Sequence, residues 1–301
     1  MPVRLTAFPS DGPALRRVFR EGGAYLIGRG ADCDLILADR AVSRQHARLA
    51  GDEAGWRLED LASKNGTQID GRVIGAARLD GTAWLSLGGV SIFLETIDTD
   101  AAKREAVIDA RRERRARILR ERLRPGQDYS GLLETCLDGA LELGACERGS
   151  LWFRTNDDQY AHALRRGPEG PPESRSVIDS VFATGAAVLS HDVEGVEALA
   201  RRQSILSGGV RALICLPLAV SGTVHGVIYA DSRTPGKIFT ELDIALLRGL
   251  ADHAALTLAV VRLRGEILAL GLTPPKSAAA AANDPGLLRL LKNRLPDYPH
   301  A

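Results

Sequence analysis

The sequence predicts a multidomain chain: an all-β sandwich, then a connector helix, then an α+β domain with an antiparallel sheet. Short apolar runs separated by Gly, Asp and Asn fill residues 1–98, as in small all-β domains. Residues 99–127 are rich in Ala, Arg and Glu and hold no glycine or proline before Pro125, which predicts one helix. In residues 128–265, amphipathic segments alternate with strand-like runs. Residues 266–301 read as a flexible tail with a short amphipathic helix.

Composition narrows the function classes. A length of 301 residues, 45% hydrophobic and 26% charged, fits about two ordinary globular domains. The net charge of +1 gives no reason to expect nucleic acid or an anionic membrane as the main partner. There is no signal-peptide core and no run of about 18 apolar residues, so we expect a soluble cytoplasmic protein without a membrane segment.

The first domain is predicted from short strand-like runs with turn residues between them. Such spacing is typical of a two-sheet sandwich, in which the binding loops gather at one end. Trp56 and Trp84 lie within these runs, and we expect both to be core aromatics. The runs are VRLTAF, LRRVF, AYLIG, DLIL, WRLEDL, AWLSL and VSIFLETI.

Three polar islands interrupt the strand-like runs between Tyr25 and Gly71. They are Gly28-Arg29, Ser43-Arg44-Gln45-His46 and Ser63-Lys64-Asn65-Gly66-Thr67. A phosphorylated side chain carries close to two negative charges and three acceptor oxygens, so its receptor needs fixed donors and positive charge.

The side chains in these islands match that requirement. The planar fork of Arg29 can hold two phosphate oxygens, and Ser43 adds a hydroxyl donor. Arg44 and Lys64 add positive charge from neighbouring loops. The amide of Asn65 can donate to and accept from the backbone of an extended peptide.

The order and spacing of the islands resemble those of the forkhead-associated (FHA) domain, a phosphothreonine-binding module. The resemblance implies that Arg29, Ser43 and Asn65 are ligand contacts, with Arg44 and Lys64 at phosphopeptide-binding positions where the family varies. The pocket for the third residue after the phosphothreonine would lie near a small neutral side chain, Ala41, so no preference there is predicted. The positions that support the site are Gly28, His46, Gly66 and Thr67, with His46 tying one binding loop to another.

The arginine-rich segment after the first domain has two readings. Its arginines suit a nucleic-acid arm, but the acidic residues Glu105, Asp109, Glu113 and Glu121 are interspersed among them. We therefore expect a connector helix, which could pair with its copy in a homodimer. Direct binding to nucleic acid is not favoured. The apolar positions form an imperfect stripe: Val107, Ile108, Ile118, Leu119 and Leu123.

The second domain begins with a predicted amphipathic helix, YSGLLETCLDGALELG, and ends with a long helix that has Thr240 as its N-cap. Between them, VRALICLPLAV and TVHGVIYADS flank the two-residue turn Ser221-Gly222 and predict the central hairpin of an antiparallel sheet. The first helix has one apolar face: Leu132, Leu133, Cys136, Leu137, Ala140 and Leu141.

These runs are similar to those of a GAF domain, through LICLPL, Gly226–Asp231 and Phe239-Thr240 before the last helix. The resemblance implies a pocket that can hold a cyclic nucleotide, a tetrapyrrole or another small molecule, and terminal helices that often dimerise. The cyclic-nucleotide signature is absent, and Cys215 lies within a predicted strand with no cue for chromophore attachment. The ligand is therefore unassigned, and no cofactor is predicted.

The sequence gives no support for an enzyme. His162, His191, His225 and His253 share the second domain, but none stands beside a nucleophile motif or in a metal-binding spacing. The cysteines form no CxxC pair, and we expect reduced, buried thiols. These cysteines are Cys33, Cys136, Cys146 and Cys215.

Together, the two resemblances suggest bacterial signalling downstream of serine/threonine kinases. We expect a non-enzymatic adaptor or sensor that binds a phosphothreonine protein and uses its GAF domain for dimerisation or small-molecule sensing. The alternative is a transcription-regulatory protein acting with a separate DNA-binding or ATPase partner, since the chain holds no Walker motif. The tail helix, with Leu287, Leu288, Leu291 and Leu295, could dock on the GAF surface, bind a partner or stay disordered.

Overall fold

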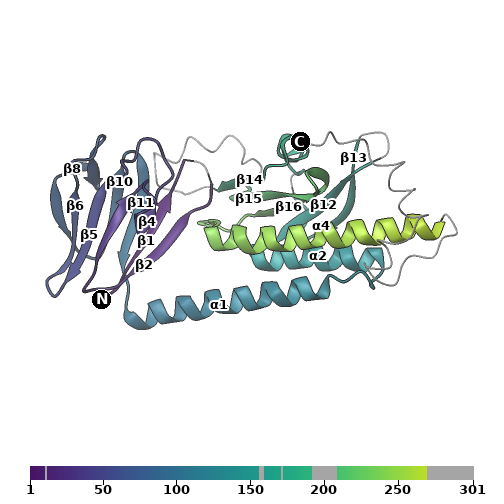
Figure 1. The fold of residues 1–301 in the computed structure, drawn as a ribbon, viewed down its shortest axis with the longest axis horizontal. Coiled ribbons are helices and arrows are strands. Elements are labelled where there is room, and N and C mark those ends of the chain that lie inside the picture. The colour runs from purple at the N-terminus through teal and green to yellow at the C-terminus, as the bar shows by residue number, and fades with distance from the viewer. Residues whose placement is uncertain (11, 156–158, 171, 192–208, 270–301) are drawn as a thin grey trace.

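The computed structural model describes residues 1–10, 12–155, 159–170, 172–191 and 209–269. Within these residues, a β-sandwich is followed by a long helix and then by a sheet with helices packed against it (Figure 1). The predicted fold class is confirmed. The expected tail helix lies outside the described residues.

The N-terminal domain consists of two sheets packed face to face. In the first sheet the strand order is β2-β1-β11-β10-β7-β8, and in the second it is β4-β3-β5-β6-β9. The strands are β1 (Val3–Phe8), β2 (Leu15–Phe19), β3 (Ala24–Gly28), β4 (Leu35–Ile36), β5 (Ala47–Asp52), β6 (Gly55–Asp60), β7 (Thr67–Ile69), β8 (Arg72–Ile74), β9 (Ala76–Leu79), β10 (Thr82–Leu87) and β11 (Val90–Thr96).

The core of the sandwich lies between the inner faces of these sheets. Alternate residues along the strands are buried, as expected when one face of a sheet packs on another. Trp56 is 3% exposed, as expected of a core aromatic, whereas Trp84 is only partly buried and packs against Phe93 in a tilted arrangement with ring centroids 5.0 Å apart. Fully buried core residues include Leu5, Ile27, Leu49, Leu58, Leu85 and Ile92.

A single helix, α1 (Thr99–Arg122), leads out of the sandwich and runs alongside the helices of the second domain (Figure 1). Asp98 caps it by accepting a hydrogen bond from the Ala101 N–H at 2.5 Å. Near its end, Ala116 and Leu119 are buried against the second domain. Val107 and Ile108, by contrast, are about half exposed, so the apolar residues of α1 do not form one continuous face.

The C-terminal domain is built on an antiparallel sheet with strand order β13-β12-β16-β15-β14. Helices α2 and α4 pack on one face of this sheet, and α3 packs on the other. The elements are α2 (Tyr129–Gly144), β12 (Arg148–Arg154), β13 (Tyr160–Arg166), α3 (Arg175–Thr184), β14 (Val188–His191), β15 (Ala212–Val220), β16 (Thr223–Ser232) and α4 (Glu241–Ala269).

Local sequence signals account for the elements at the centre of this domain. Ser221 and Gly222 both have positive φ angles, 50° and 81°, which the tight turn of the β15–β16 hairpin requires. At the start of α4, Asp243 accepts from the Thr240 N–H at 2.6 Å, and the Asp243 N–H faces the Thr240 hydroxyl at 3.4 Å. This reciprocal pair is a capping box that fixes the beginning of the helix.

Helix α4 is also long and apolar enough, over Glu241–Gly265, to cross a membrane by length and composition. Half of that stretch is buried inside the domain, against α2, α1 and the sheet. Burial of this extent fits a core helix of a globular domain, while Leu256, Val260 and Leu263 of the same helix remain exposed.

Candidate functional site

The predicted site residues come together in the loops at one end of the sandwich. Arg29 follows β3, and its N–H donates to the carbonyl of Ser43 at 3.0 Å. Ser43 lies between β4 and β5, and its hydroxyl accepts from the N–H of Lys64 at 3.0 Å. The side-chain amide of Asn65 donates to the Ala41 carbonyl at 2.7 Å. Three separate loops are therefore held against one another by direct hydrogen bonds.

Gly28 sits where the backbones of two loops come closest. A Cβ atom at this position would lie 2.3 Å from the carbonyl oxygen of Arg44 and 2.9 Å from that of Ser43. Neither atom can move without displacing the backbone that carries the site. The structure therefore explains why a glycine precedes Arg29: no other residue lets the loops approach this closely.

The imidazole of His46 joins two of the loops from inside the domain, where it is 0% exposed. Its Nδ1 accepts from the N–H of Ser43 at 3.1 Å, and its Nε2 lies 3.1 Å from the carbonyl oxygen of Gly66. Because one partner is a donor and the other an acceptor, this network assigns the proton of a neutral ring to Nε2. His46 thus positions Ser43 on one side of the site and Gly66 on the other.

Asp60 is a supporting residue that the sequence reasoning missed. It accepts hydrogen bonds from the Ser63 N–H at 2.8 Å, the Ser63 hydroxyl at 2.6 Å and the Thr67 hydroxyl at 2.6 Å. Burial acts to raise the pKa of Asp60, but the hydrogen bonds from Ser63 and Thr67 and the proximity of His46 outweigh it, so the pKa is lowered. The available signal was an aspartate three residues before a serine, which is typical of an Asx turn.

The loop after β3 is fixed to the loop that carries Arg44 by two further contacts. The side-chain amide of Gln45 donates to Asp32 at 2.6 Å, and the thiol of Cys33 donates to the Arg44 carbonyl at 3.1 Å. These contacts hold the loop that follows Arg29 against the backbone of Arg44 and Gln45. Both guanidinium groups remain exposed to solvent. The backbone of the site is therefore held by hydrogen bonds, while the long charged side chains of Arg29 and Arg44 extend away from it.

The cationic side chains themselves remain available to a ligand. Arg29, Arg44 and Lys64 are exposed, and within the described part of the chain none of the three uses its side chain in a hydrogen bond or ion pair. Ser43 keeps its hydroxyl proton, because the Lys64 contact uses only an oxygen lone pair. Asn65 keeps its carbonyl oxygen and one N–H. This arrangement can bind a compact anion attached to an extended chain.

The remaining sequence candidates are the histidines and cysteines named above. Among the residues that the structure describes, no group of three or more His, Cys, Asp and Glu could hold a metal ion. Burial raises the pKa of Cys215 in β15 to about 12, so its thiol is protonated and shielded. Phe182, Val181 and Tyr229 pack together on the face of the sheet that α3 covers.

Two family models match separate parts of the chain. Residues 126–259 match the family model described as a GAF domain. Residues 16–98 match the model described as the cytoplasmic domain of the inner membrane component of the type III secretion system. The chain is also 49% identical, over 45 residues, to the FHA domain-containing protein FhaB of Mycolicibacterium smegmatis. That match covers 15% of this chain and only 29% of the length of FhaB.

Solved structures of both kinds of domain are also similar to parts of this chain. One, described as an analysis of phosphothreonine-dependent FHA domain interactions, is 31% identical and covers 33% of this chain and 99% of that chain, with a TM-score of 0.30. The GAF domain of the cyanobacteriochrome TePixJ is 21% identical and covers 46% of this chain and 92% of that chain, with a TM-score of 0.35.

Proposed function

Because the chain joins an N-terminal domain that resembles FHA domains to a GAF domain, we propose that it is a non-enzymatic signalling adaptor that binds phosphothreonine-containing proteins. The observation that carries this proposal is the convergence of Arg29, Ser43 and Asn65 at one end of a rigid sandwich. Their remaining hydrogen-bonding capacity faces outward, and hydrogen bonds between the loops hold the three residues near one another.

The residues divide the recognition of a phosphopeptide between them. The guanidinium of Arg29 and the hydroxyl of Ser43 bind phosphate oxygens through charge-assisted hydrogen bonds. Arg44 and Lys64 add favourable charge at the rim, and Asn65 binds the peptide backbone. A dianionic phosphate satisfies all of these donors, whereas an unphosphorylated threonine leaves the cations unpaired. Binding therefore depends on phosphorylation.

The cellular role follows from this chemistry. A serine/threonine kinase supplies the phosphorylated partner, and the adaptor docks on it in the bacterial cytoplasm. The functional units are residues 1–98 for phosphopeptide binding, 99–127 as connector, 128–265 as the GAF domain and 266–301 as the tail. No catalytic step belongs to this proposal.

For the GAF domain, the exposed surface supports dimerisation. Leu256, Val260 and Leu263 of α4 are 55%, 49% and 42% exposed and lie at helical spacing along one side. A second copy of the chain can cover this face by packing α4 on α4. Small-molecule sensing would need space between α3 and the sheet, where Phe182 and Tyr229 are packed.

The test is a titration of the full chain with a degenerate phosphothreonine peptide pool, against matched unphosphorylated and phosphoserine pools. Replacing Arg29 with Ala should weaken binding by about 2 to 4 kcal/mol, roughly 30-fold to 1000-fold. Arg78→Ala is the matched control, because Arg78 is an exposed arginine of the same domain that pairs with Asp52. Equal binding of phosphorylated and unphosphorylated pools would refute the proposal.

A further inference from the structure

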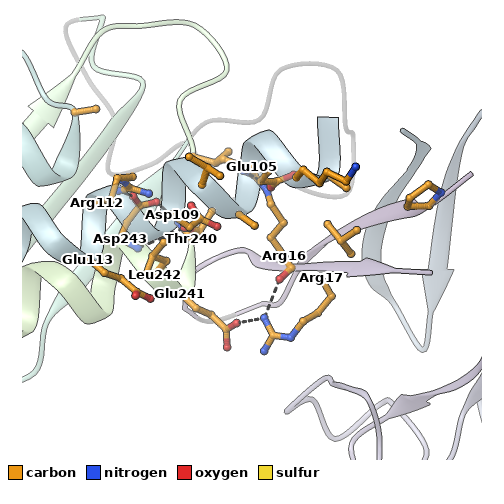
Figure 2. Close-up of a pocket in the computed structure, with 18 of the residues that line it drawn as sticks. Arg16, Arg17, Glu105, Asp109, Arg112, Glu113, Thr240, Glu241, Leu242 and Asp243 are labelled. Atoms are coloured by element: carbon orange, nitrogen blue, oxygen red, sulfur yellow. Dashed lines mark hydrogen bonds and ion pairs between the residues drawn. The ribbon is translucent and has the colours of Figure 1, made fainter. Parts of the chain in front are cut away.

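The two domains meet through backbone hydrogen bonds between Ala14, just before β2, and the start of α4. The Ala14 N–H donates to the carbonyl of Phe239 at 2.9 Å, and the Glu241 N–H donates to the carbonyl of Ala14 at 3.1 Å. Ala14 is 0% exposed, and it forms a parallel bridge with Thr240. The Arg17 guanidinium adds an ion pair to Glu241 at 2.7 Å (Figure 2).

The same stretch of chain also contacts the loops of the candidate phosphopeptide site. Four positions before Ala14, the hydroxyl of Ser10 donates to Asp39 at 3.1 Å. The other carboxylate oxygen of Asp39 accepts from the Ala41 N–H at 2.8 Å. The Ala41 carbonyl in turn accepts from Asn65. A short series of contacts therefore runs from Asn65 to the segment that docks on the GAF domain.

Ion pairs also link the sandwich to α1, where Arg4 of β1 donates to Glu105 at 2.9 Å. A cavity of about 1230 Å³ lies between β2, α1 and the start of α4, with Val18, Ala106 and Leu242 in its lining. Across it, Glu105 of α1 accepts from Arg16 at 3.4 Å (Figure 2). Ion pairs between partly exposed side chains contribute little to stability. The cavity leaves part of this contact unpacked, and the apolar cores of the two domains are separate clusters, so the docked arrangement can shift without disrupting either core.

We propose that phosphopeptide binding strengthens the docking of the N-terminal domain on the GAF domain through Ser10 and Ala14, a coupling that rests on the proposed phosphothreonine function. A peptide held by Ser43 and Asn65 restrains the loop containing Ala41. When this loop is restrained, Asp39 stays in position to accept the hydrogen bond from the Ser10 hydroxyl. A Ser10 held in this way favours the docked position of Ala14. The coupling is reciprocal, so weaker docking lowers peptide affinity.

The output of this coupling is the N-terminal end of α4. The docking partners Phe239, Thr240 and Glu241 surround the capping box with Asp243. Helix α4 is continuous from there to the exposed face at Leu256. The state of the peptide site is therefore transmitted to a helix whose far half is available to a partner.

Hydrogen exchange of the full chain, with and without the degenerate phosphothreonine peptide pool, tests the coupling. Saturating peptide should slow exchange at the amides of Ala14 and Glu241, which report the two interdomain hydrogen bonds. In Ser10→Ala, the peptide should still bind, but this slowing should be lost. Arg17→Ala should lower peptide affinity by about twofold to fivefold, as expected for loss of one partly exposed ion pair. Arg78→Ala should change neither quantity.

The outcomes separate the coupling from the underlying function. Phosphopeptide binding without slower exchange at Ala14 and Glu241 would overturn the coupling and leave the binding function standing. Full protection in Ser10→Ala would also overturn it, because the route would not pass through Ser10. If the wild-type chain bound no phosphopeptide, both proposals would fail together.

Discussion

The Nε2 atom of His46 lies 3.1 Å from the carbonyl oxygen of Gly66, and this contact connects the loop after β4 to the loop after β6. The ring is fully buried, and its Nδ1 is occupied by the Ser43 N–H. A neutral histidine is the residue that can accept on one side and donate on the other. The geometry of the loops that carry the predicted site residues therefore depends on a fully buried side chain.

Replacing His46 with Ala should reduce both stability and phosphopeptide affinity. The change leaves the part-buried Ser43 N–H without its partner, which costs about 1 to 3 kcal/mol. It also removes the closer of two contacts of the Gly66 carbonyl, which keeps only the Gly88 N–H at 3.4 Å. Urea unfolding followed by tryptophan fluorescence would measure the stability change. His225→Ala is the control, since His225 is exposed on β16. An unchanged unfolding midpoint for His46→Ala would contradict the role assigned to the ring.

Gly28→Ala should disrupt the site strongly, although the substitution adds only one methyl group. The added methyl group would lie 2.3 Å from the Arg44 carbonyl oxygen, so the loops carrying Ser43 and Arg44 must move. We expect a loss of about 2 kcal/mol or more in stability, together with loss of phosphopeptide binding.

Gly75→Ala provides a matched control for that experiment within the same domain. A Cβ atom at Gly75 has no neighbour within 4 Å, and its backbone does not need a positive φ angle. Both variants carry the same chemical change, so a difference between them isolates the steric contact at Gly28. Wild-type peptide affinity in Gly28→Ala would show that the close approach is not needed for binding.

Asp60 should make the N-terminal domain sensitive to acid. Its pKa is lowered in the folded state, so it binds protons less readily than in the unfolded chain. The stability it contributes is present above its unfolded pKa of about 3.9 and is lost as the pH falls through the lower folded value. Asp60→Asn should therefore destabilise the domain at pH 7 and flatten the decline in stability below about pH 4.

Unfolding curves of the wild type and Asp60→Asn from pH 7 to pH 3 would measure this effect. Asp52→Asn serves as the control, because Asp52 is an exposed carboxylate at a strand end in the same domain. If the two variants showed the same pH dependence, the hydrogen bonds from Ser63 and Thr67 would not be setting the acid response.

The buried thiols predict a response at the opposite end of the pH range. Burial raises the pKa of Cys136, Cys146 and Cys215 to about 12 each. Their stabilising effect is complete below the unfolded pKa of about 8.5 and is lost as the pH rises towards the folded value. A disulfide reagent at pH 8 should modify none of the three until denaturant is added. Rapid modification of the native chain would contradict their burial.

Much of this architecture could be predicted because its signals are local. The hairpin turn at Ser221-Gly222 and the helix start at Thr240 depend on residues next to each other in the sequence. Strands β7, β8 and β9 were not predicted separately, because three or four residues are too few to show a period of two. Strand β5 was also missed, because its sequence ARLAGD is rich in Ala, Gly and Asp, which are uncommon in strands. The contact of Ala14 with Phe239 could not be predicted at all. It joins backbone atoms, and such a hydrogen bond does not require a particular side chain at either position.

The connector helix α1 is a second case in which the sequence did not predict a contact. Its stripe from Val107 to Leu123 suggested one dimer-forming face, but Leu119 and Leu123 are buried against the chain's own GAF domain while Val107 remains exposed. Periodicity reveals which residues are apolar, and it does not reveal which surface covers them. Arg29, Ser43 and Asn65 lie in the loops between strands that the sequence pattern indicated, and their role in binding a phosphopeptide stays a prediction.

The exposed face of α4 predicts self-association, because Leu256, Val260 and Leu263 leave a row of apolar side chains facing solvent. Val260→Glu places a charge in the middle of this row. It should shift the chain from dimer towards monomer in sedimentation measurements, since a buried unpaired carboxylate costs several kcal/mol. Val73→Glu is the control, because Val73 is 74% exposed on the N-terminal domain. A wild-type chain that is monomeric at high concentration would refute the dimer. If the wild type is a dimer and Val260→Glu sediments in the same way, the dimer interface lies on another surface.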